Sequence, residues 1–175
     1  MKRKLLTFDE FSAKPYSLWD TQWLLLTSGD YGSGTYNAMT VGWGSIGCMW
    51  SKPFVQVVVR PTRYTYKFLN DFETFTLTAF PDQYRKALAL LGAKSGRDGD
   101  KIKESGLTAI ASHTIAAPGF AEAELILECR KTYWDDLRPE NFLDEGLHQK
   151  YPEKDYHRIY FGEIIAIYAD SALYA

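Results

Sequence analysis

Residues 36–43 carry the sharpest alternation of large apolar and small side chains in this sequence. In an extended strand, the odd-numbered residues from Met39 to Trp43 would form a bulky apolar face, because successive side chains point to opposite sides. The even-numbered residues from Ala38 to Gly44 would leave the other face nearly bare. A strand loses side chains where a flat object lies against it, or where the strand bends. We therefore expect the bulky face to enter a core, and the small face to meet either a flat ligand or a bend.

The rest of the chain contains several short apolar or alternating runs and few helical patterns. Strands are predicted over residues 23–28, 36–43, 54–59 and 73–80, from residue 121 onwards, and over 157–168. The β-branched run 54–59 is expected to be buried on both faces. Helices are predicted over 62–72, over 81–91 and shortly before Gly106, whereas residues 135–155 are expected to be irregular. Many strands with few helices predict a mainly β or α+β domain.

Composition and charge place the chain among ordinary globular domains. Its 175 residues are predicted to form one domain, residues 1–175, with 46% hydrophobic and 24% charged side chains. The net charge of −2 lacks the basic excess of a nucleic-acid binder, so no nucleic-acid partner is expected. No apolar run approaches transmembrane length, so no membrane association is expected either. Cys48 and Cys129 are expected to be buried free thiols, which fits a cytoplasmic location.

Positive side chains gather at two predicted helix starts. Thr62 is a favourable N-cap, which would place Arg63 in the first turn and Thr65 at the third helical position. A cation in the first turn opposes the helix dipole, and a bound phosphate would remove this conflict. The same composition recurs before the next short helix, in Lys94, Ser95, Gly96, Arg97 and Lys101. Two such sites favour a phosphate-bearing ligand over solvent-exposed arginines.

Other chemistries find less support in the sequence. The glycines of Gly42–Gly47 match a dinucleotide-binding fingerprint, but no crossover helix can begin in the following segment Met49–Pro53. The cysteines and histidines lack metal-ligand spacing, so no metal is expected. His113 and His148 are expected at the surface. His157 could be a proton donor, a substrate contact or a turn residue, and the pattern alone favours the turn residue. A solvent-exposed strand face is predicted for Glu122, Glu124 and Glu128.

Six segments, in this order along the chain, resemble the flavin reductase-like family. They are Asn37–Gly44, Lys52–Pro53, Arg60–Thr65, Lys94–Lys101, Ala121–Glu124 and Asp155–Arg158, spread over roughly residues 20 to 168. The resemblance implies an FMN-binding split β-barrel, largely antiparallel, with small peripheral helices. It also implies a homodimer with FMN near the subunit interface. Ring contacts would come from the strand at 36–43, and phosphate contacts from the Arg63–Thr65 turn and the loop at Ser95.

The resemblance extends to individual residues and to the reaction. The residues expected to bind the cofactor are Met39, Thr40, Val41, Gly42, Trp43, Gly44, Arg60, Arg63, Tyr64, Thr65, Lys94, Ser95, Gly96 and Lys101. No protein side chain is expected to be catalytic, because the flavin would carry the hydride chemistry, and His157 is expected to contact the substrate. The frequency of activities in the family favours an oxidoreductase that reduces flavin with NADH or NADPH. The alternatives are an FMN-holding electron carrier for a redox partner protein, and a ligand-binding barrel without a redox role.

Overall fold

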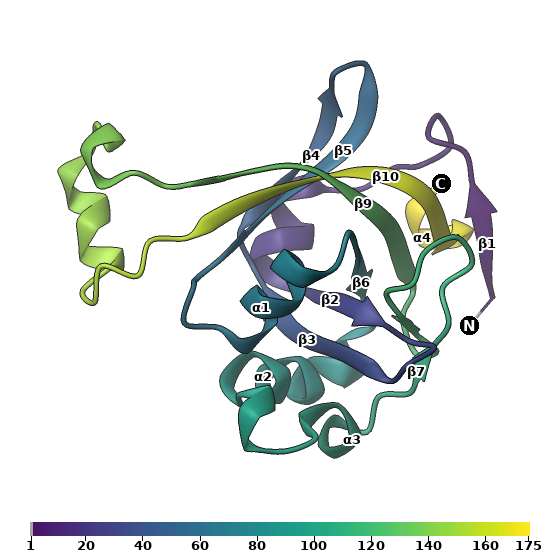
Figure 1. Ribbon diagram of the computed structural model, residues 1–175. Coiled ribbons are helices and arrows are strands. Elements are labelled where there is room, and N and C mark those ends of the chain that lie inside the picture. Colours follow the sequence, from purple (N-terminus) through teal and green to yellow (C-terminus); the bar gives the residue numbers. More distant parts are fainter. Residues whose placement is uncertain (1) are drawn as a thin grey trace.

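One large antiparallel sheet organises the chain in the computed structural model, which describes residues 2–175 (Figure 1). Its eight strands are β1 (Arg3–Leu6), β2 (Leu24–Asp30), β3 (Thr35–Val41), β4 (Gly44–Met49), β5 (Lys52–Val59), β6 (Thr74–Ala79), β9 (Leu125–Asp136) and β10 (Arg158–Asp170). They follow the order β3-β2-β6-β9-β10-β5-β4, with β1 also paired to β10. A separate small sheet consists of β7 (Ala109–Ile110) and β8 (Gly119–Phe120). The predicted antiparallel, mainly β fold is confirmed.

The helices are short, as expected, and lie around the sheet. They are α1 (Tyr64–Asp71), α2 (Arg85–Ala93), α3 (Lys101–Ser105) and α4 (Ser171–Tyr174), together with a π-helical turn at Ser17–Gln22. Single 3₁₀ turns occur at Asp82–Tyr84, Gly96–Asp98, Pro139–Asn141 and Glu145–Lys150. Helix α1 packs against β2 and β3, and α2 packs against β3 (Figure 1). In residues 2–175 no helix is both long and apolar enough to cross a membrane.

Strands β3 and β4 stand at opposite ends of the strand order but follow one another in the chain. Only Gly42 and Trp43 separate them, so the Cα atoms of Val41 and Gly44 can be at most about 11 Å apart. The sheet must therefore curl until its two end strands approach each other, and Figure 1 shows this curled form. We call the region around the link Gly42–Trp43, where these two end strands meet, the opening of the sheet.

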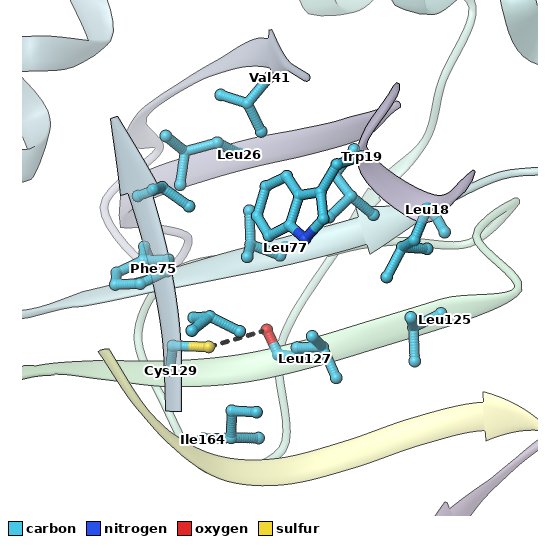
Figure 2. Close-up of a cluster of buried hydrophobic side chains, with 14 of the residues drawn as sticks. Leu18, Trp19, Leu26, Val41, Phe75, Leu77, Leu125, Leu127, Cys129 and Ile164 are labelled. Carbon is cyan, nitrogen blue, oxygen red and sulfur yellow. Dashed lines mark hydrogen bonds between the residues drawn. The ribbon is translucent and has the colours of Figure 1, made fainter. Parts of the chain in front are cut away.

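The inside of the curled sheet is filled by a cluster of apolar side chains (Figure 2). Leu26 of β2, Val41 of β3 and Leu127 of β9 reach this cluster from separate strands. Trp19 of the π-helical turn adds its indole ring, as Figure 2 shows. A Cβ atom added at Gly44 would lie 2.4 Å from Cη2 of Trp19. The absence of a side chain at residue 44 therefore permits the close packing of Trp19 at the opening of the sheet.

Strand β5 is buried on one face only, so the expectation of burial on both faces is wrong. Val55, Val57 and Val59 are fully buried, whereas Phe54 and Gln56 are only partly buried. The helices α1 and α2 pack against β2 and β3 instead, which leaves the outer face of β5 without a helix over it. A β-branched run of this length does not by itself distinguish the two situations.

Strand β4, which pairs with β5 in a hairpin, and strand β1 have no counterpart among the predicted strands. The turn of the hairpin contains Trp50 and Ser51, whose φ angles are 53° and 56°. Both values lie in the left-handed region, where glycine or asparagine is usual, so the sequence lacks the common hairpin signal. Strand β1 pairs with β10 over Arg3–Leu6, a segment for which no strand was predicted.

Two of the three glutamates expected on a solvent-exposed strand face are buried. Glu128 is fully buried and accepts hydrogen bonds from the backbone N–H groups of His113 and Thr114, both at 2.8 Å. Glu124 is also buried and accepts a hydrogen bond from the Tyr174 hydroxyl at 2.7 Å. Glu122 is only partly buried, but it lies in a turn before β9 and not on a strand, so the predicted strand face is wrong for this residue as well. Strand alternation cannot reveal that a loop and the C-terminal helix supply donors to these carboxylates.

The two cysteines differ in their surroundings. Cys129 is fully buried, as expected, and burial raises the pKa of its thiol well above the ordinary value. Cys48 lies on β4 and is exposed, so its expected burial is wrong. The reason is the hairpin, which carries its residues away from the core (Figure 1).

Candidate functional site

The small face of β3 is divided between helix α2 and the opening of the sheet. Ala38 is fully buried in a second apolar cluster, beneath α2. The hydroxyl of Thr40 donates a hydrogen bond to the carbonyl of Leu88 at 2.5 Å, and a Cβ at Gly92 would lie 3.2 Å from the Thr40 Cβ. The small residues of β3 therefore let α2 approach closely. Only the partly buried Thr40, Gly42 and the residues after it remain for a flat ligand.

The bulky face of β3 enters the core as predicted at Met39 and Val41, but Trp43 lies after the strand and is half exposed. Met39 and Val41 are buried among the side chains inside the sheet, so only their backbone atoms could reach a ligand. β3 is the end strand of the sheet, and within residues 2–175 its outer edge has no strand partner. Backbone amide and carbonyl groups on this edge are therefore available to a polar ligand.

Helix α1 begins one residue later than predicted, so the assignment of Thr62 as N-cap is wrong. Arg63 occupies the N-cap position with extended backbone and no side-chain cap, and Tyr64 is the first helical residue. Thr65 is buried in the first turn, where its hydroxyl accepts a hydrogen bond from the Asn37 amide at 2.7 Å. This contact joins the start of α1 to β3. The Arg63 side chain makes no capping hydrogen bond to the helix and is therefore available for other contacts.

Two cations, the partly buried Arg63 and the buried Lys101, lie beside the C-terminal end of α2. The guanidinium of Arg63 donates a hydrogen bond to the carbonyl of Gly92. The Lys101 Nζ donates to the carbonyls of Leu91 and Lys94, at 2.8 and 2.9 Å. These carbonyls belong to the last turn of α2, where backbone acceptors have no helical partner. The sequence thus brings two cations from different segments to one place.

The charges of these two cations are not neutralised by a carboxylate. Within residues 2–175, neither Arg63 nor Lys101 has a carboxylate oxygen within salt-bridge distance. Burial, and next the nearby Arg63, lowers the pKa of Lys101 from 10.5 to about 8. Burial, and next Arg60, lowers the pKa of Arg63. A bound anion would relieve this unfavourable concentration of positive charge.

The loop at Ser95 reaches the same region, although its side chains are mostly engaged within the protein. Ser95 caps the turn Gly96–Asp98 by accepting a hydrogen bond from the Arg97 N–H at 3.2 Å. Lys94 forms an ion pair with Glu104 at 2.7 Å. Gly96 packs directly against Asn37, because a Cβ added there would lie 2.4 Å from the Asn37 Oδ1 atom.

A cavity of about 850 Å³ adjoins this cluster of polar residues. It is lined by residues of β3, α1 and α3, including Tyr36, Asn37, Tyr64, Gly96 and Lys101. A second cavity of about 510 Å³ opens beside Gly42, Trp43 and Gly44, with Tyr16 and Trp19 on its other side. Both volumes are within the range of small-molecule sites.

Arg60 and His157 are held by the segment of residues 137–157, which joins β9 to β10 and which we call the arm (Figure 1). Arg60 donates hydrogen bonds to Asp155 at 2.5 Å and to the carbonyl of Lys150 at 2.7 Å, so it is engaged with the arm. His157 is buried beside the half-exposed Trp43, with ring centroids 5.4 Å apart. Burial, and next the charge of Arg60, lowers the pKa of His157 from 6.5 to about 4.

The remaining histidines do not join this site. His113 is exposed and stacks on Tyr168 at a centroid distance of 4.1 Å. His148 is only partly buried, and its Nδ1 atom lies 2.8 Å from the hydroxyl of Tyr156. Asn37 was not among the predicted site residues. The one sequence feature that pointed to Asn37 is an amide side chain next to the apolar residues of a strand. Such an amide needs a polar partner when it is buried.

Comparisons with known proteins agree with this architecture. The family model described as "Flavin reductase like domain" matches residues 19–175. Similar solved structures include an FMN-binding domain of a flavin reductases-like enzyme from Shewanella baltica, with 16% identity, a TM-score of 0.70, and coverage of 97% of this chain and 78% of that chain. The flavoredoxin of Desulfovibrio vulgaris has 22% identity, a TM-score of 0.67 and coverage of 89% and 73%. Nitrilotriacetate monooxygenase component B from Bacillus cereus has 17% identity, a TM-score of 0.68 and coverage of 91% and 77%. No curated protein matches the chain.

Proposed function

Because this chain belongs to the flavin reductase-like family, we propose that it binds FMN without a covalent bond. The observation that carries this proposal is the pair of cations Arg63 and Lys101, which lie together without a carboxylate among the described residues. A phosphate is the anion that FMN would bring to such a pair, and arginine is suited to bind it. The residues present therefore fit the group that the family implies.

In this proposal, the cations hold the phosphate, while Thr65, Ser95 and Gly96 shape its surroundings. Polar groups on the free edge of β3 would meet the polar edge of the flavin ring, and Gly42 and Gly44 leave room near the opening. Trp43 is half-exposed beside His157 and would contact the ring or the substrate. Lys94 and Arg60 have partners within the protein and would act by positioning the loop and the arm.

We further propose that the protein is an oxidoreductase that reduces flavin with NADH or NADPH. FMN when bound supplies the hydride-accepting chemistry, and the protein supplies binding, orientation and exclusion of water. The partly apolar cavity beside Trp43 supports this function because it could admit a second flat molecule against Trp43, whose ring contacts that of His157. An FMN-holding electron carrier is the alternative, since such a protein would need the cations but not a site for a nicotinamide.

Anaerobic stopped-flow spectroscopy distinguishes these two functions. We expect NADH or NADPH to bleach the absorbance of protein-bound FMN much faster than that of free FMN, because the protein would align both rings. A His157→Ala variant should slow the bleaching, whereas the exposed His113→Ala variant should not. Bleaching at the rate of free FMN with both nucleotides would remove the reductase and leave the electron carrier.

We also propose that the protein forms a homodimer with the flavin near the subunit interface. The chain exposes several large aromatic side chains on β9 and on the β4–β5 hairpin, including Trp50, Tyr133 and Trp134. Exposed aromatic groups of this kind are typical of protein interfaces. Light scattering should give a mass of about twice 20.0 kDa for the FMN-loaded protein. A mass of one chain with FMN fully bound would contradict the dimer.

A further inference from the structure

The arm presents the side chain of Tyr151 to the imidazole of His157. The Tyr151 hydroxyl lies 2.9 Å from the Nδ1 atom of His157, and the two ring centroids are 5.4 Å apart. Both side chains are buried, with 6% and 8% of their surfaces exposed. On its other side, the imidazole faces the indole ring of Trp43. His157 therefore lies between a fixed phenol and the opening of the sheet.

The hydrogen bond determines which nitrogen of His157 carries the proton. A neutral imidazole has one N–H donor and one acceptor nitrogen. If Nδ1 were the donor, the hydroxyl hydrogen of Tyr151 would need another acceptor, and within residues 2–175 this hydroxyl has no second partner. If Tyr151 donates instead, Nδ1 accepts this bond and the imidazole proton lies on Nε2. Within residues 2–175 this nitrogen has no hydrogen-bond partner, but it is not among the buried unpartnered side-chain atoms, so solvent or a ligand can reach it. Buried polar groups without partners are costly, so the second arrangement is favoured.

Several contacts hold Tyr151 in this position. The Arg60 guanidinium lies 4.9 Å above the centre of the Tyr151 ring while it bonds to Asp155 and to the Lys150 carbonyl. The ring of Tyr156 stacks on Tyr151 at a centroid distance of 4.6 Å. The phenol is thus fixed before any ligand arrives. Because the pKa of His157 is lowered to about 4, its imidazole is neutral at pH 7. The imidazole then carries one proton, either on Nδ1 or on Nε2.

We propose that Tyr151 is a positioning residue that fixes His157 as the Nε2–H tautomer and so presents a neutral hydrogen-bond donor beside Trp43. The proposal that the Nε2–H group donates to a bound ligand rests on the proposed function. The assignment of the tautomer does not depend on that function. A neutral donor suits a flat, uncharged acceptor such as a carbonyl or a ring nitrogen. It does not add a positive charge that would repel an oxidised nicotinamide ring.

Two-bond ¹H–¹⁵N NMR correlation on histidine-labelled, flavin-free protein tests the tautomer directly. At pH 7 we expect the His157 signals, assigned by their loss in His157→Gln, to show the Nε2–H form. Tyr151→Phe keeps the aromatic ring but should shift these signals toward a mixture of tautomers. Tyr156→Phe is the matched control, because its hydroxyl bonds to His148 and it should leave the His157 signals unchanged. An Nδ1–H form in the wild type, or unchanged His157 signals in Tyr151→Phe, would overturn the proposal.

Bleaching of bound FMN tests the use of the donor. Tyr151→Phe should slow bleaching by about two- to tenfold, the range expected for one hydrogen bond, and should add little to the effect of His157→Ala. An undiminished rate in Tyr151→Phe would overturn the positioning role. If neither NADH nor NADPH bleaches the FMN bound to the wild-type protein, the reductase function is wrong. The NMR measurement still tests whether Tyr151 fixes the His157 tautomer. Circular dichroism and urea midpoints of each variant show whether a change reflects loss of folding instead.

Discussion

Replacing Arg63 by alanine is expected to weaken FMN binding by about 10- to 100-fold, because a hydrogen bond between charged groups contributes roughly 1.5–3 kcal/mol. Riboflavin lacks the phosphate, so its affinity should fall much less. Fluorescence titration of flavin-free protein with each flavin measures both dissociation constants. The difference between the two losses isolates the phosphate contact from any general change in the site.

Lys86→Ala provides the matched control for this experiment. Lys86 is an exposed cation on α2, so its removal changes the net charge by the same amount at a distance from the proposed site. FMN affinity should be almost unchanged in this variant, since long-range effects of exposed charges are screened by salt. Equal losses of FMN and riboflavin in Arg63→Ala would remove the phosphate assignment.

Acidification is expected to destabilise the protein through His157. The pKa of His157 is about 4 in the folded chain and about 6.5 in the unfolded chain. Above pH 6.5 its imidazole is therefore mostly neutral in both the folded and the unfolded chain. Between pH 6.5 and 4 the unfolded state takes up a proton that the folded state does not, and stability falls as pH falls. The full loss from this residue should approach about 3 kcal/mol near pH 4.

Urea unfolding at several pH values between 7 and 4 measures this loss. The dependence should be strongly reduced in His157→Gln, which cannot be protonated. It should persist in His113→Gln, because His113 is exposed. Arg60, which follows β5, and Asp155 of the arm both lie near His157 and remain in both variants, so their own contributions cancel in the comparison. A pH dependence that is the same in His157→Gln and the wild type would contradict the buried, neutral state.

The fold could be predicted largely because strand alternation and short apolar runs are local signals. Residues 36–43 show this well, since Met39 and Val41 enter the core as their spacing indicates. The β4–β5 hairpin could not be predicted, because its turn uses Trp50 and Ser51 in left-handed conformations that these residues rarely adopt. Strand β1 depends on pairing with a strand near the other end of the chain, which local sequence does not encode.

The candidate site was only partly predictable for a similar reason. The cations of the two segments were recognisable by type, but their meeting depends on the carbonyls at the end of α2, which hold both Arg63 and Lys101. The small face of β3 has two uses, since Thr40 lies under α2 and only Gly42 reaches the opening. The partner of Thr65 is Asn37, a contact between an edge strand and a helix start that no sequence pattern specifies.

The central claim is that this chain holds FMN at the cluster of Arg63 and Lys101. The most direct measurement is the titration of purified, flavin-free protein with FMN, followed by removal of free ligand and an absorption spectrum. We predict a bound flavin band at one FMN per chain, with FMN bound more tightly than riboflavin. A protein that shows no flavin band after this treatment, or that binds riboflavin as tightly as FMN, would contradict the claim.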